Sequence, residues 1–188
     1  IETREEGRFQ PDLSAVSAAM TPRTKVMILS SPSNPTGAVI EPQRLKALSG
    51  LARAHQMFVI SDEIYDQIIF PPVQVRSIVQ ENREATEWVI LVNGVSKTYA
   101  MTGWRIGYAA GPKNVIDAMT ALQSHSTSNP TSISQYAALA ALTGDQAEVK
   151  RMAGEFHQRR DRLVNGLQGL SGLSCFMPQG AFYAWCNV

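Results

Sequence analysis

The stretch Lys25-Val26-Met27-Ile28-Leu29-Ser30 indicates the fold class of this 188-residue chain. Its apolar side chains stand at consecutive positions, so both faces of a strand would be apolar, which is typical of buried strands in parallel sheets. Comparable apolar runs follow at 57–61, 88–93 and 106–110. Helical spacing of apolar residues is found around them, at 12–20, 42–55, 113–123, 131–143 and 145–167. This alternation predicts an α/β fold of three layers, α/β/α, around a mostly parallel sheet.

The composition excludes several classes of protein. Lys and Arg total 17 and Asp and Glu total 16, so the net charge of +1 gives no strong field that would attract nucleic acid or an anionic membrane. Two cysteines, Cys175 and Cys186, are too few for a disulfide scaffold, and we expect both to be reduced. The three histidines are too far apart for a metal site. No apolar run approaches the roughly 18 residues of a membrane span.

The beginning of the chain indicates where the protein resides. Its charged N-terminus lacks the apolar segment of a signal peptide, and it starts at Ile1 rather than at a methionine. We therefore expect a cytoplasmic protein, or a trimmed piece of one.

Polar residues follow three of the predicted strands, at the edge where ligands bind in sheets of this kind. The first of these loops is Asn34-Pro35-Thr36-Gly37. Its residue types predict a turn on local grounds alone. The alternative is that the side-chain amide of Asn34 is offered to a ligand at the sheet edge.

The second loop begins with Asp62, directly after the predicted strand 57–61, and Tyr65 comes three residues later. A carboxylate at this edge is expensive to bury unless a positive or protonated group meets it. Aspartate is also a favourable cap for a helix N-terminus. Both a capping role and a ligand contact therefore stay open for Asp62. Tyr65 would point the same way if a helical turn began here.

The third loop contains Ser96 and Lys97 after the predicted strand 88–93, with Arg105 eight residues beyond the lysine. A lysine amine held in a partly buried site becomes a nucleophile. The planar guanidinium of Arg105 is suited to binding phosphate. The alternative is an ordinary lysine and arginine on the surface.

Taken together, the three loops resemble the active-site segments of the class I and II aminotransferases of fold type I, which use pyridoxal 5′-phosphate. The loop at Asn34, the Asp62-x-x-Tyr65 step and the Ser96-Lys97…Arg105 unit match that family in order and spacing. The run from Ser96 to Tyr108 is the longest match and is most similar to the prokaryotic-type aspartate aminotransferases. Residues 178–183, Pro-Gln-Gly-Ala-Phe-Tyr, are similar to the beginning of the family's small domain.

The resemblance implies a role for each candidate residue. Lys97 would hold the cofactor as a Schiff base and move the proton during transamination. Asp62 would face the pyridine nitrogen, and Tyr65 and Asn34 would hydrogen-bond the phenolic oxygen. Arg105, assisted by Ser96, would pair with the phosphate. The implied reaction transfers an amino group from an L-amino acid, aspartate foremost, to a 2-oxo acid such as 2-oxoglutarate.

The resemblance also implies how the chain is organised, because members of the family are much longer. Residues 1–168 would be the C-terminal part of the large domain, ending in a long interdomain helix, and residues 169–188 the first strands of a truncated small α+β domain. The whole protein would be a homodimer, and we expect the isolated chain to be inactive.

Two other functions stay open. A pyridoxal-phosphate-dependent β-lyase, or an aminotransferase for another amino acid, would share the same residues. The aminotransferase-like sensor domain of a transcription regulator would follow a basic DNA-binding segment, and these 188 residues contain none.

Overall fold

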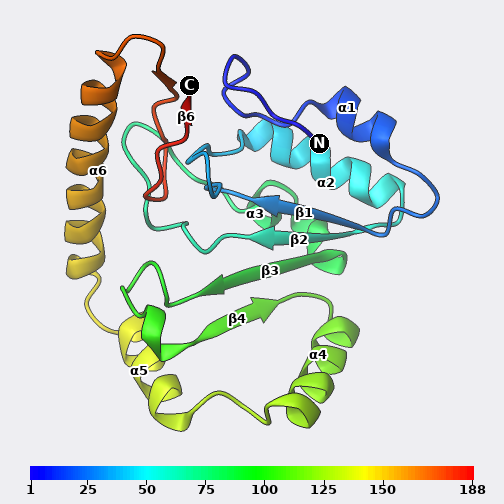
Figure 1. Ribbon diagram of the computed structural model, residues 1–188. Helices are drawn as coiled ribbons and strands as arrows, with labels where there is room; N and C mark the ends of the chain where they lie inside the picture. Colours follow the sequence, from blue (N-terminus) through cyan, green and yellow to red (C-terminus); the bar gives the residue numbers. More distant parts are fainter.

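A computed structural model describes residues 1–188 and shows a four-stranded sheet flanked by helices (Figure 1). The strands lie in the order β1 (Val26–Ser30), β2 (Phe58–Asp62), β3 (Val89–Gly94) and β4 (Gly107–Ala110). The helices are α1 (Leu13–Ala19), α2 (Pro42–Ala54), α3 (Ile78–Glu81), α4 (Lys113–Ser126), α5 (Ser132–Thr143) and α6 (Ala147–Gln168). Two 3-10 helices complete this part of the fold, η1 (Arg83–Glu87) and η2 (Thr102–Trp104). Because β1, β2 and β3 are parallel and only β4 is antiparallel, the predicted α/β class with a mostly parallel sheet is confirmed.

The local sequence explains where the first helices begin. The Asp12 carboxylate accepts hydrogen bonds from the backbone N–H groups of Ser14 at 2.8 Å and Ala15 at 3.4 Å, and so caps α1. Pro42 opens α2 in the first turn, where a missing N–H leaves no intrahelical bond unmade. The sequence did not predict α3 and η1, because elements of four and five residues are too short to show a helical period. No helix combines the length and apolar character that a membrane span requires.

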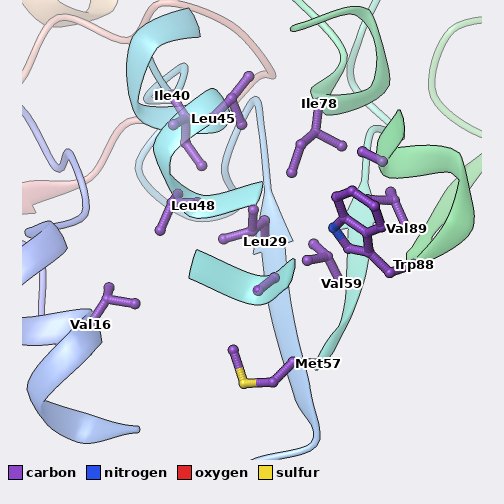
Figure 2. Packing of buried hydrophobic residues seen from close by; sticks show 12 residues of the cluster. Val16, Leu29, Ile40, Leu45, Leu48, Met57, Val59, Ile78, Trp88 and Val89 are labelled. Carbon is purple, nitrogen blue, oxygen red and sulfur yellow. The ribbon is translucent and has the colours of Figure 1, made fainter. Parts of the chain in front are cut away.

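The main hydrophobic core lies between α1, α2 and α3 and one face of the sheet (Figure 2). Leu48 and Ala52 of α2 and Val59 of β2 are fully buried in it. The other face of β1 is not covered in this chain, since Ile28 is 72% exposed. The prediction that this strand is buried on both faces is therefore wrong for these 188 residues, because an apolar run does not say which segments cover it.

The last part of the chain forms a small antiparallel pair, β5 (Ser174–Cys175) and β6 (Cys186–Asn187), in which Cys175 lies opposite Cys186 and both are free thiols. These strands are only two residues long each, because the residues between them bond elsewhere. The backbone N–H groups of Gln179 and Gly180 donate to the Gly37 carbonyl at 2.8 and 3.0 Å, and Ala181 donates to the Ile68 carbonyl at 2.8 Å. The terminal segment is thus fastened to two loops at the sheet edge.

Gly37 is expected to tolerate no side chain. Its φ is +69°, and an added Cβ would lie 2.6 Å from Pro178 Cβ and 2.9 Å from the Gly180 oxygen. Gly37→Ala should therefore lower the free energy of unfolding by about 1–3 kcal/mol, as measured by urea titration. Gly154→Ala in α6 is the control: nothing lies within 4 Å of its added Cβ. It should raise the stability by about 0.5–1 kcal/mol. Equal stability of the two variants would contradict the steric argument.

Candidate active site

The carboxyl ends of the parallel strands bring the three predicted loops to one edge of the sheet (Figure 1). Ser30 pairs with Asp62 and Asp62 pairs with Val92, so the ends of β1, β2 and β3 lie at one level. Asn34 follows β1, and Lys97 lies three residues beyond Gly94, the last residue of β3. The candidate amine and the candidate carboxylate therefore come from neighbouring strands at the same edge.

The antiparallel return of β4 brings the segment that contains Arg105 back to the end of β3. Gly94 pairs with Gly107, and the Val95 N–H donates to the Ile106 carbonyl at 3.4 Å, so Ser96 and Arg105 each lie one residue beyond this last backbone contact. A Cβ at Gly94 would lie 2.8 Å from the Ile106 oxygen, so this close approach requires glycine. The exposed Arg105 has a φ of 55°, and its Nη1 donates to the Thr102 carbonyl at 2.9 Å.

The Asp62 side chain does not cap a helix, because residues 64–67 form a turn. Its Oδ1 accepts a hydrogen bond from the Ile64 N–H at 3.2 Å instead, so the capping interpretation is wrong. Tyr65 is 3% exposed and lies in an apolar cluster with Ile68, Phe70 and Ala181. Burial raises the pKa of the Tyr65 phenol well above its ordinary value of 10.0, and the nearby charge of Asp62 acts in the same direction.

Tyr183 joins the site, although the sequence analysis did not select it. Its hydroxyl oxygen lies 2.6 Å from the Tyr65 hydroxyl oxygen and accepts a hydrogen bond from Asn34 Nδ2 at 3.3 Å. Tyr65 and Asn34 are thus brought together through Tyr183. Its place next to Phe182 in the 178–183 run was the only signal in the sequence that could have indicated it.

Lys97 is half-buried and lines a cavity of about 400 Å³ together with Ser96, Phe156, Arg159 and Phe182. Its Nζ lies 5.6 Å from the centroid of the Phe182 ring and forms no ion pair within 4.0 Å. The Phe182 ring in turn packs edge-on against the Tyr65 ring, with centroids 5.3 Å apart. The Lys97 amine, which has no ion-pair partner, therefore lies in a cavity next to the hydrogen-bonded pair of Tyr65 and Tyr183. Arg105 does not line this cavity.

Glu63, next to Asp62, carries a second half-buried carboxylate. Ser61 Oγ and Ser77 Oγ each donate to Glu63 Oε1 at 2.9 Å. Because Ser77 caps α3, this carboxylate ties the start of α3 to the end of β2 and so supports the backbone at Asp62. Burial raises the pKa of the Glu63 carboxyl above its ordinary value of 4.5.

The raised pKa of Glu63 predicts a pH effect on stability. Just above pH 4.5 the unfolded chain has lost this proton while the folded chain still binds it. The free energy of unfolding therefore falls as the pH rises through this window. Glu63→Gln cannot ionise and should show a shallower fall in urea titrations at increasing pH. Asp66, whose pKa burial also raises and whose charge helps to raise that of Glu63, is present in both proteins, so the difference between the two profiles reports Glu63 together with its interaction with Asp66. Parallel pH profiles would contradict the prediction.

The donor set at this edge fits pyridoxal phosphate in its chemistry. The cofactor's aldehyde requires a primary amine, and its pyridine nitrogen requires a carboxylate. Its phenolic oxygen is matched by a phenol with an amide, and its phosphate by a guanidinium with a hydroxyl. Fold and site together define an α/β protein with a ligand site at the carboxyl edge of its parallel strands.

Comparisons with known proteins identify the family. A family model described as aminotransferase class I and II matches residues 1–188. The chain belongs to this family, whose members are pyridoxal-phosphate-dependent enzymes.

Individual relatives match along the whole chain. The chain is 46% identical to the aspartate aminotransferase of Geobacillus stearothermophilus over 188 residues, 100% of this chain and 48% of that relative. It is 45% identical to the aspartate/prephenate aminotransferase of Thermus thermophilus over 186 residues, 97% of this chain and 47% of that protein. The crystal structure of the aspartate aminotransferase from Rhizobium meliloti matches with a TM-score of 0.95 at 40% identity, covering 99% of this chain and 47% of that one. The chain thus spans about half the length of the curated relatives it matches.

Proposed function

We propose that the whole protein containing this chain transfers an amino group between L-aspartate and 2-oxoglutarate with pyridoxal 5′-phosphate as cofactor. The proposal depends mainly on the cavity that contains the Lys97 amine, which has no ion-pair partner. Phe182 in the wall of this cavity packs against Tyr65, and Asp62 lies at the same edge of the sheet. The name aspartate aminotransferase, which the Geobacillus and Rhizobium relatives carry, supports this choice of substrate.

Each residue of this chain has a proposed task. Lys97 would attach the cofactor through its Nζ and, once substrate displaces it, its free amine would move the proton from the substrate α-carbon to the adjacent carbon of the cofactor. Asp62 holds a proton on the ring nitrogen through its negative charge. Tyr65 and Asn34 donate to the phenolic oxygen. Arg105 and Ser96 bind the phosphate. The bound cofactor supplies an electron-accepting ring conjugated to the reacting carbon.

The organisation of the whole protein is part of the proposal. Residues 1–168 form the later part of a cofactor-binding domain, and residues 169–188 begin a small domain that the bonds to Gly37 and Ile68 hold against the site. The protein is a cytoplasmic homodimer. Exposed apolar side chains on α4 and α5, among them Leu122, Ile133 and Tyr136, support a further protein surface packing there.

Half-reactions of the whole protein test the function. Loaded with pyridoxal phosphate, it should convert aspartate to oxaloacetate and lose the visible cofactor band, and 2-oxoglutarate should restore the band. Prephenate is the second acceptor to be tried, because the Thermus relative is named for it. Release of ammonia and pyruvate from an amino acid that carries a leaving group on its β-carbon, such as a cysteine thioether, would indicate a β-lyase instead. Cofactor binding without amino transfer to any acceptor would support the sensor alternative and overturn the proposal.

A further inference from the structure

A second tyrosine hydroxyl meets the residues proposed to hold the phenolic oxygen of the cofactor. The hydroxyl oxygens of Tyr183 and Tyr65 are 2.6 Å apart, and Asn34 Nδ2 donates to Tyr183 at 3.3 Å. Three side chains from distant segments of the sequence therefore share one hydrogen-bonded cluster. Within it, Tyr183 contacts both of the other two.

The backbone, rather than the hydroxyl, sets the position of Tyr183. Gln179 donates to the Gly37 carbonyl and Ala181 to the Ile68 carbonyl, each at 2.8 Å, which fastens the segment before Tyr183 to both neighbouring loops. The Tyr183 ring also packs edge-on against the Tyr65 ring, with centroids 5.7 Å apart. A phenylalanine at this position would keep these contacts and lose only the hydroxyl.

The hydrogen bonds of the cluster can run in one direction. A phenol hydroxyl has one proton to donate and can accept as well. Since Asn34 donates to Tyr183, the Tyr183 proton is available for the Tyr65 oxygen, and the Tyr65 proton is then available for another acceptor. A negatively charged oxygen is a stronger acceptor than a neutral hydroxyl. Hydrogen bonds in such a chain strengthen one another.

We propose that Tyr183 is a positioning residue that donates to Tyr65 and thereby strengthens the hydrogen bond from Tyr65 to the phenolic oxygen of bound pyridoxal phosphate. This inference rests on the proposed function, in which Tyr65 binds that oxygen. Stronger donation stabilises the negative form of the oxygen. The midpoint of the pH titration of the visible cofactor band should therefore be lower with Tyr183 than without it.

The test is a pH titration of the visible band of the whole, cofactor-loaded protein, compared among wild type, Tyr65→Phe, Tyr183→Phe and the double variant. Tyr183→Phe should raise the midpoint by about 0.3–1 pH unit, less than Tyr65→Phe does. In the Tyr65→Phe background, Tyr183→Phe should cause no further shift, because Tyr183 acts through Tyr65. A purely structural role would not produce this dependence.

A matched control removes another partly buried phenol hydrogen bond. The Tyr99 hydroxyl donates to Gln146 Oε1 at 2.9 Å, and Tyr99→Phe should leave the midpoint unchanged. If Tyr183→Phe fails to fold, Tyr183→Met fills the space without a hydroxyl and should shift the midpoint in the same direction. An unchanged or lowered midpoint, or additive shifts in the double variant, would overturn the inference alone. A wild-type protein without any cofactor band would overturn the proposed function as well.

Discussion

Lys97→Ala is expected to abolish covalent attachment of pyridoxal phosphate to the whole protein. Lys97 contributes the amine to the cavity of about 400 Å³ and is not engaged in an ion pair. Its loss also removes the group proposed to move the proton at the substrate α-carbon, so transamination should fall by about 10²–10⁴-fold or more. Borohydride reduction, which makes the bond between cofactor and amine permanent, followed by peptide mass spectrometry, checks the attachment.

Lys113→Ala is the matched control for this variant. Lys113 is a solvent-exposed lysine at the start of α4 that pairs with Asp117. Its removal should leave both the labelled peptide and the turnover unchanged. A cofactor label that persists in Lys97→Ala, on any other lysine, would refute the assignment of the amine.

Most of the fold could be predicted from the sequence because runs such as Val26–Ser30 and Phe58–Asp62 are short, apolar and followed by polar residues. These features report local conformation and burial. They do not report pairing partners, and so the antiparallel direction of β4 and the uncovered face of β1 at Ile28 needed coordinates.

The site could be predicted only in part for the same reason. Asp62 ends a strand and Asn34, Tyr65 and Lys97 each follow one, so the rule that parallel strands end at one edge indicates all of them. Tyr183 does not follow a strand and lies 118 positions from Tyr65. The backbone bonds from residues 179–181 to Gly37 and Ile68 bring it to the site, and no local pattern encodes those bonds.

Asp62→Asn is expected to reduce transamination by about 10²–10³-fold, the range found when a preorganised electrostatic partner is removed from a reacting centre. The amide is nearly isosteric and its oxygen can still accept from the Ile64 N–H, as the carboxylate does at 3.2 Å, so the turn should be preserved. Only the negative charge that would hold a proton on the ring nitrogen is lost. Covalent attachment at Lys97 should persist, which separates this defect from that of Lys97→Ala.

Asp66→Asn controls for the loss of a carboxylate nearby. Asp66 is also half-buried beyond the same strand, but it accepts a hydrogen bond from Asn93 Nδ2 at 3.2 Å. Its loss should change stability more than turnover. Asp62→Glu, which keeps the charge on a longer side chain, should recover part of the activity, whereas a neutral residue should not. Full activity of Asp62→Asn with aspartate and 2-oxoglutarate would show that the charge at position 62 does not act on the ring, because geometry and attachment would then suffice.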